Sequence, residues 1–148
     1  MKIVIINGPN INLLGSREVD IYGIQSYHEL CRLVKAEGKR LKIKIKMFQS
    51  NAEGNIIDLI QRAHHRKVNG LIINPGAYTH YSYAIYDALM AVAFPIVEVH
   101  LSDITMREDF RKKSVTAPAC RKVFMGQGFF SYLEAIQYLV GEIQCMKK

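Results

Sequence analysis

The chain has 148 residues, of which 49% are hydrophobic and 22% are charged, and its formal net charge is +7 at pH 7. This length suits one domain with its own core, and this composition excludes an intrinsically disordered chain. We therefore expect a single domain over residues 1–148.

The positive charge is compatible with two kinds of partner. Nucleic-acid binding requires clustered Lys and Arg, whereas an anionic small molecule needs only a few cations in a cleft. The lysines are spread along the chain without interleaved aromatic residues or a recognition-helix pattern. We therefore favour an anionic substrate and expect no nucleic-acid partner.

Neither a membrane segment nor a metal site is predicted. The apolar run Ile3–Ile6 is shorter than a signal-peptide core and far shorter than a membrane span, so we expect a cytoplasmic protein. The three cysteines are widely spaced and include no Cys-x-x-Cys pair, which argues against a disulfide framework or structural zinc. His64 and His65 have no third ligand at a suitable spacing, and we expect exposed polar residues there.

Short apolar runs rich in β-branched residues predict five strands. In chain order they are Ile3–Ile6, Ile43–Phe48, Leu71–Ile73, Ile96–Val99 and Val123–Met125. In the second run, Lys42, Lys44 and Lys46 alternate with apolar residues, which is typical of a strand at the edge of a sheet.

Helical patterns lie between these runs. Ser26-x-x-Glu29 and Ser50-x-x-Glu53 both match the capping box that begins many helices. Two further helices are expected over residues 82–92 and 129–145. This alternation predicts an α/β fold built from right-handed βαβ units, a flavodoxin-like three-layer sandwich with a five-stranded parallel sheet in the order 2-1-3-4-5.

In such a sheet, ligands bind beyond the carboxyl ends of the strands, near the point where the strand order reverses. The loops after the first, third and fourth strands should therefore form one cleft, although they are far apart in the sequence. The first of them, Gly8 to Gly23, is long for a strand-to-helix connection, and such loops are often lids or binding loops.

Each polar residue of these loops also has a structural interpretation. Tyr22 taken alone would pack half-buried, and His80 or His100 taken alone would be a hydrogen-bonded structural histidine. The asparagines that follow the strands would satisfy backbone groups of turns.

Two other classes of function remain open on the residues alone. The fold also serves flavin or nucleotide binders and phospho-receivers, but a receiver needs acids where Asn7 and Asn74 stand at the ends of the first and third strands. A basic, non-catalytic interaction module is the second alternative. An imine mechanism is disfavoured because no lysine lies in the three loops.

Several motifs together strongly resemble type II 3-dehydroquinate dehydratase. They are Gly8-Pro9-Asn10-Ile11-Asn12-Leu13-Leu14-Gly15, Arg17-Glu18, Ile21-Tyr22-Gly23, Phe48-Gln49-Ser50-Asn51-x-Glu53-Gly54, Asn74-Pro75-Gly76-Ala77-Tyr78-Thr79-His80 and Glu98-Val99-His100-Leu101-Ser102. Their order and spacing are matched from about Lys2 to Tyr138. The resemblance implies dehydration of 3-dehydroquinate to 3-dehydroshikimate in the shikimate pathway, with no metal or organic cofactor.

The resemblance also implies roles for individual residues. Tyr22 would be the base that removes the proton next to the ketone, with Arg17 beside it on the same loop. His100 would protonate the departing hydroxyl, Glu98 would orient His100, and Asn10 would hold a water that supports the enolate. The physical chemistry agrees, because a tyrosine titrates near ~10 and a nearby guanidinium favours its charged form.

Substrate binding is implied for a larger set of residues. They are Asn74, Gly76, Ala77, His80, Leu101, Ser102 and Arg111. Asp87 would reach the site of a neighbouring subunit, because members of the family are homo-oligomers of trimers grouped into dodecamers. Val19 stands where many members have proline, and Tyr81 and Tyr83 make the third helix bulkier than usual.

Overall fold

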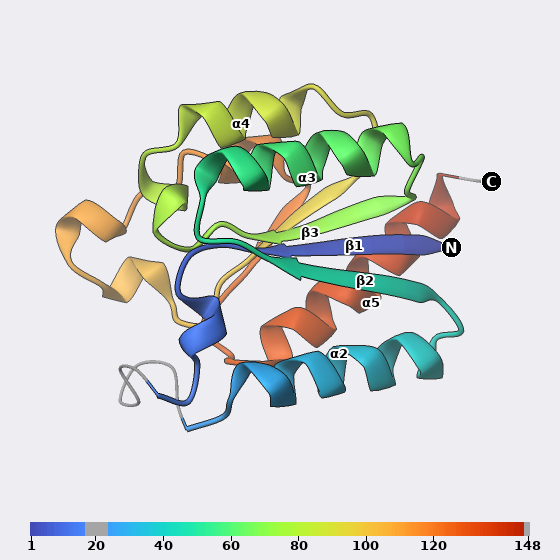
Figure 1. The fold of residues 1–148 in the computed structure, drawn as a ribbon, viewed down its shortest axis with the longest axis horizontal. Helices are drawn as coiled ribbons and strands as arrows, with labels where there is room; N and C mark the ends of the chain where they lie inside the picture. The colour runs from blue at the N-terminus through green and yellow to red at the C-terminus, as the bar shows by residue number, and fades with distance from the viewer. Residues whose placement is uncertain (17–23, 147–148) are drawn as a thin grey trace.

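The computed structural model describes residues 1–16 and 24–146, which form a parallel sheet covered by helices on both faces (Figure 1). The strands are β1 (Lys2–Asn7), β2 (Lys44–Gln49), β3 (Gly70–Asn74), β4 (Ile96–Val99) and β5 (Lys122–Phe124). Their order in the five-stranded sheet is β2-β1-β3-β4-β5, and all neighbours are parallel. The α/β fold with flavodoxin-like strand order is therefore confirmed.

The four longer helices divide between the two faces of the sheet (Figure 1). They are α2 (Tyr27–Arg40), α3 (Glu53–His65), α4 (Tyr83–Met90) and α5 (Phe130–Cys145). Helices α2 and α5 cover one face, while α3 and α4 cover the other. Short 3-10 turns lie in the connections, namely η1 (Ile11–Leu13), η2 (Gly76–His80), η3 (Ile104–Met106), η4 (Asp109–Arg111) and η5 (Ala117–Ala119). None of the helices in the described ranges is long and apolar enough to cross a membrane.

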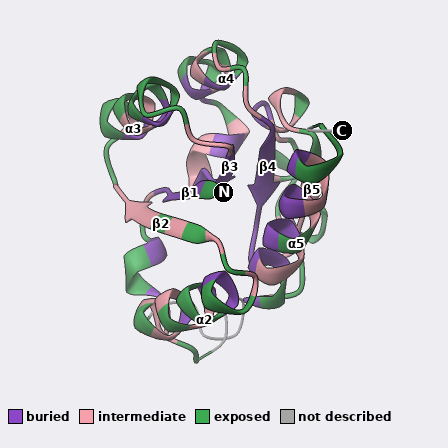
Figure 2. Cartoon of the chain, turned by 90° about the vertical axis from the view of Figure 1, so that its right-hand side faces the viewer, coloured by how far each residue is buried: buried purple, intermediate pink, exposed green. Residues whose placement is uncertain are grey.

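Two apolar clusters, one on each face of the sheet, form the core. Successive side chains of a strand point to opposite faces, so Ile3 and Ile5 of β1 join the cluster under α2 and α5. Val4 and Ile6 join the cluster under α3 and α4. Figure 2 shows the consequence, with the central strands buried and the outer faces of the helices exposed. Each fully buried Val or Ile contributes roughly 1.5–3 kcal/mol to folding.

The two predicted capping boxes have different outcomes. Ser26 is the N-cap of α2, and its hydroxyl accepts from the Glu29 N–H while Glu29 accepts from the Ser26 N–H at 2.6 Å. The second prediction is wrong, because α3 begins at Glu53 after Ala52, which caps it without a side-chain hydrogen bond. The Glu53 carboxylate instead accepts a 2.5 Å hydrogen bond from Ser82, the N-cap of α4.

The carboxyl ends of β1 and β3 lie against each other. Asn7 and Asn74 are register partners, and the Gly8 N–H donates to the Asn74 carbonyl at 2.7 Å. A side chain at Gly8 would meet backbone, because its Cβ would lie 2.3 Å from the Pro75 carbonyl oxygen. This close approach brings the segments that follow β1 and β3 together at one edge of the sheet.

Candidate active site

A cleft of about 160 Å³ lies beyond the carboxyl ends of β1, β3 and β4. Three separate segments line it, as the strand order predicts for a parallel sheet. Its lining residues are Pro9, Asn10, Ile11 and Leu14 after β1; Asn74, Gly76, Ala77 and His80 from the end of β3 and η2; and His100, Leu101, Ser102, Ile104, Arg107 and Arg111 after β4.

Most of the predicted site residues lie in or behind this cleft. The predicted residues that line it are Asn10, Asn74, Gly76, Ala77, His80, His100, Leu101, Ser102 and Arg111. Glu98 lies behind His100, and Asp87 lies on α4 and does not line the cleft of its own chain. Tyr22 and Arg17 are outside the described residues.

A buried carboxylate and a histidine form the centre of the site. His100 Nε2 lies 2.7 Å from Glu98 Oε1, and both side chains are almost fully buried. β4 fixes their relation, because residues two apart on an extended chain point the same way. With Nε2 bonded to an ionised carboxylate, it is this nitrogen that carries a proton, and a second proton on Nδ1 would make an imidazolium that the carboxylate stabilises.

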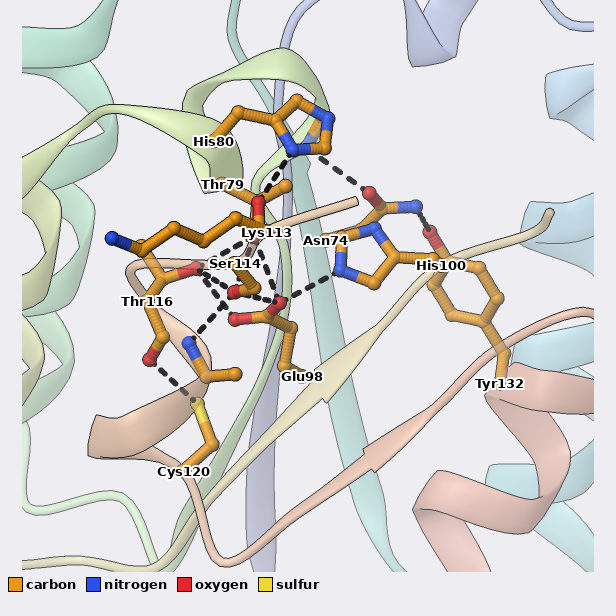
Figure 3. Close-up of polar contacts among 12 residues, drawn as sticks. Asn74, Thr79, His80, Glu98, His100, Lys113, Ser114, Thr116, Cys120 and Tyr132 are labelled. Carbon is orange, nitrogen blue, oxygen red and sulfur yellow. Dashed lines mark hydrogen bonds and ion pairs between the residues drawn. The ribbon is translucent and has the colours of Figure 1, made fainter. Parts of the chain in front are cut away.

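Three hydroxyl groups complete the surroundings of Glu98 (Figure 3). Thr79 and Ser114 donate to Oε1 at 2.9 Å each, and Thr116 donates to Oε2 at 2.6 Å. Burial by itself would raise the pKa of the Glu98 carboxyl, but the hydrogen bonds from His100, Thr116 and Thr79 outweigh it and hold this pKa below its usual range. Glu98 is therefore ionised at neutral pH even though it is buried.

His80, which also lines the cleft, is held in a neutral form. Its Nδ1 lies 2.8 Å from the Lys113 carbonyl oxygen, which can only accept, so Nδ1 carries the proton of the neutral ring. Desolvation lowers the pKa of His80 against the effect of this backbone hydrogen bond, and the positive charges of His100, Arg111 and Arg107 lower it further. The ring therefore offers Nε2 as an acceptor.

Two arginines give the cleft its positive charge. Arg107 and Arg111 both line it, and their Nε atoms lie 3.4 and 3.3 Å from the Glu108 carboxylate. The single negative charge of Glu108 leaves the pair with net positive charge. Both arginines follow the fourth predicted strand in the sequence, but a substrate-binding role is predicted for Arg111 alone, because the family resemblance implies it. Two planar guanidinium groups suit an anionic ligand such as a carboxylate.

Asn10 has an unusual backbone conformation next to the cleft. Its φ angle of 66° lies in the left-handed region, which Asn adopts more readily than most other residues with a side chain. Its N–H donates to Asn51 Oδ1 at 3.0 Å, and Gln49 Nε2 donates to the same oxygen at 2.9 Å and to the Gly8 carbonyl at 3.2 Å. Gln49, the last residue of β2, and Asn51, which follows the strand, therefore fix the segment that carries Asn10.

Asn74 is held by a second buried network. Its Nδ2 donates to the Tyr132 hydroxyl at 2.8 Å, and that hydroxyl donates to Asn7 Oδ1 at 2.7 Å. The Gly76 N–H donates to Asn74 Oδ1 at 3.1 Å. The predictions missed Tyr132, because at its place in α5 it reads as an apolar core position.

The cleft can bind a small anion and transfer a proton through His100. Within residues 1–16 and 24–146, no group of three or more His, Cys, Asp or Glu side chains is placed to hold a metal ion. The chemistry that these residues offer is acid–base chemistry on an anionic substrate, with a buried pair of Glu98 and His100 at its centre.

Comparison with known proteins identifies the family to which the chain is similar. Residues 1–140 match the family model described as dehydroquinase class II. The 3-dehydroquinate dehydratase of Clostridium acetobutylicum is 54% identical over 139 residues, covering 94% of this chain and 96% of that protein. The enzyme of the same name from Clostridium beijerinckii is 53% identical over 148 residues, the whole of both chains.

Solved structures show the same similarity. The type II dehydroquinase from Butyrivibrio crossotus superposes with a TM-score of 0.93 at 49% identity, covering 94% of this chain and 97% of that one. The type II dehydroquinase from Propionibacterium acnes gives a TM-score of 0.90 at 34% identity, with 93% and 94% covered.

Proposed function

The chain belongs to the class II dehydroquinase family, and we propose that it eliminates water from 3-dehydroquinate through an enolate, with Tyr22 as base and His100 as acid. It is a type II 3-dehydroquinate dehydratase, a hydro-lyase of the shikimate pathway. The single observation that carries the proposed mechanism is the buried pair of His100 and Glu98 at 2.7 Å in a cationic cleft.

In the first step, the Tyr22 phenolate removes the proton next to the ketone. The electron pair of that C–H bond forms the carbon–carbon double bond of an enolate, and the π electrons of the ketone move onto its oxygen. A water held at Asn10 stabilises this enolate oxygen. The positive charge of Arg17 would favour the phenolate form of Tyr22. Both Tyr22 and Arg17 are proposed from the sequence, since they are outside the described residues.

In the second step, the imidazolium of His100 donates its Nδ1 proton to the departing hydroxyl. The C–O bond breaks, water leaves, and the enolate collapses to the conjugated ketone of 3-dehydroshikimate. Glu98 supports this step because an ionised carboxylate at 2.7 Å stabilises the positive imidazolium. The proton taken by Tyr22 returns to solvent and His100 is reprotonated, which completes the cycle.

The remaining residues that line the cleft would bind the substrate. Arg111 suits the carboxylate because its guanidinium can donate two parallel hydrogen bonds. The hydroxyls of the substrate, and the part of its carboxylate that Arg111 does not bind, would contact Asn74, Gly76, Ala77, His80, Leu101 and Ser102. The proposed binding residues surround the same cleft, so one small ligand could contact them together.

We also propose the assembly and location implied by the family resemblance, a cytoplasmic dodecamer assembled from trimers. Asp87 supports this arrangement because it lies on α4, away from the cleft of its own chain, and would act in a neighbour's. Tyr81, which follows η2, and Tyr83, the first residue of α4, are 60% and 64% exposed, which favours burial against another subunit. Mixing the Tyr22→Phe and Asp87→Ala proteins, then dissociating and reassembling them, should restore part of the activity that each lacks.

The decisive experiment follows the absorbance of the conjugated enone when the purified protein meets 3-dehydroquinate. We expect turnover that survives treatment with borohydride in the presence of substrate, because no imine forms. A well-folded protein without turnover would contradict the proposed reaction, and a covalent adduct after borohydride would contradict the enolate route.

Two variants separate the acid from the base. Tyr22→Phe should abolish turnover while substrate binding survives, and Tyr83→Phe should serve as the active control. His100→Ala should still exchange the α-proton with solvent but should release little product, because only loss of the hydroxyl needs the acid. Full turnover in Tyr22→Phe would remove the tyrosinate base from the mechanism.

A further inference from the structure

We propose that Tyr132 is a positioning residue for substrate binding, whose buried hydroxyl fixes the side-chain amide of Asn74. This inference rests on the proposed function, because it acts through Asn74 as a residue that contacts 3-dehydroquinate. Tyr132 itself does not line the cleft, and its side chain is completely buried under the sheet on α5.

The contact joins parts of the chain that are remote in sequence. Tyr132 lies 58 residues from Asn74 and 125 residues from Asn7, and its hydroxyl bonds both at 2.8 and 2.7 Å. Asn7 and Asn74 are register partners at the ends of β1 and β3. The hydroxyl therefore links α5 to the ends of β1 and β3, where the cleft opens. Figure 3 shows its contact with Asn74.

The direction of each hydrogen bond follows from the Gly76 backbone. The Gly76 N–H can only donate, so the atom of Asn74 that faces it at 3.1 Å must be the carbonyl oxygen Oδ1. The amide nitrogen Nδ2 then faces the Tyr132 hydroxyl, whose oxygen accepts and whose proton passes to Asn7 Oδ1. The amide of Asn74 is thus fixed in one of its two orientations.

This orientation decides what Asn74 presents to a ligand. A primary amide has two N–H groups, and one of those on Asn74 is used by Tyr132. The second N–H and the remaining lone pair of Oδ1 are left for the cleft that Asn74 lines. An amide free to turn over would exchange donor for acceptor, and a bound hydroxyl or carboxylate oxygen would lose its partner.

Tyr132→Phe is the sharpest perturbation because it keeps the buried ring and removes only the hydroxyl. Nδ2 of Asn74 then loses its buried acceptor, and only the Gly76 N–H still holds the amide in its orientation. We expect KM for 3-dehydroquinate to rise about tenfold, the ratio for one lost buried hydrogen bond, while kcat changes less than about threefold. The matched control is Tyr138→Phe on the same helix. The hydroxyl that it removes makes no hydrogen bond to any described residue.

A double-mutant cycle distinguishes positioning from general destabilisation. Asn74→Ala removes the residue through which Tyr132 acts, so adding Tyr132→Phe to it should change KM by less than about twofold. A merely structural role would raise KM equally in both backgrounds and would overturn the proposal. An unchanged KM in Tyr132→Phe alone would overturn it as well.

A second variant covers the case in which Tyr132→Phe does not fold. Asn7→Leu replaces the acceptor of the Tyr132 proton by an apolar side chain of similar size and leaves the hydroxyl free to rotate. We expect a smaller rise in KM, roughly threefold, that again disappears in the Asn74→Ala background. The positioning role fails, and the proposed function stands, if the wild-type protein turns over 3-dehydroquinate and the Asn7 and Tyr132 variants bind it normally. Absence of turnover by the wild-type protein contradicts the proposed function itself.

Discussion

Replacing Thr116 by valine should destabilise the protein through Glu98. The Thr116 hydroxyl is fully buried and is the sole described donor to Oε2 of Glu98, at 2.6 Å, whereas Oε1 has three partners. Valine has nearly the same shape, so the change removes this hydrogen bond, together with the contacts of the hydroxyl with Thr79 and Ser114 at 2.8 and 3.3 Å, without opening a cavity. A hydrogen bond to a buried charge contributes about 1.5–3 kcal/mol, which corresponds to a fall of roughly 4–10 °C in Tm for a domain of this size.

The control has the same contact at the surface. Thr105 donates to Asp103 Oδ1 at 2.6 Å, but Thr105 is exposed. Thr105→Val should therefore leave Tm within about 1 °C of the wild type, because solvent replaces the lost partner. Thermal unfolding followed by circular dichroism at pH 7 measures both changes.

The pH dependence gives the refuting result. The folded-state pKa of Glu98 is lowered, so its ionisation stabilises the fold above the ordinary carboxyl pKa of about 4.3, and this contribution is lost as pH falls through the folded-state pKa. Thr116→Val removes one cause of the lowering. The difference in Tm between the variant and the wild type should be full at pH 7 and should shrink below about pH 4. Equal losses for the buried and exposed threonines, or a loss that is independent of pH, would refute the reasoning.

Three further outcomes are expected. Glu98→Gln removes the charge that stabilises the His100 imidazolium and should lower kcat about 10²- to 10⁴-fold in the enone assay, so a loss under about threefold would contradict the role of the pair. Gly8→Ala places a Cβ 2.3 Å from the Pro75 carbonyl oxygen and should destabilise the fold by about 1–3 kcal/mol in urea unfolding. Gly141 lies in helix α5, and a Cβ added there would meet no atom within 4 Å other than the nearby backbone of its own helix. Gly141→Ala should therefore stabilise the fold by roughly 0.5–1 kcal/mol.

The sequence predicts the layers of this fold well because local and tertiary preferences agree. Strand β4 has the predicted bounds, Ile96–Val99, since an apolar run between turn residues has no alternative place in a parallel sheet. The box at Ser26 is correct for the same reason. The box at Ser50 fails because a tertiary contact recruits Glu53 to Ser82, and no local pattern reveals a partner that lies 29 residues away.

The site is predicted only in part, for a physical reason. Residues that touch the cleft follow strand ends, so position selects them, as it does for His80 and His100. The groups that hold them come from distant segments and look ordinary where they stand. Ser114 and Thr116 lie two residues apart between η4 and η5, and Tyr132 occupies a core position of α5. Nothing in the local sequence distinguishes their hydroxyls from those of other residues.

The two buried networks should therefore have separable effects although one segment carries both. Thr79 binds Glu98 and Asn74 binds Tyr132, and the two residues lie at opposite ends of the stretch from the end of β3 through η2. Among the residues that the structure describes, no side-chain hydrogen bond joins one network to the other. Loss of the Thr116 hydroxyl should act on the ionised carboxylate, and hence on stability and the acid, while loss of the Tyr132 hydroxyl should act on KM. A Thr116→Val/Tyr132→Phe double variant should consequently show the sum of the two changes, and strong non-additivity would mean that η2 transmits a structural shift between them.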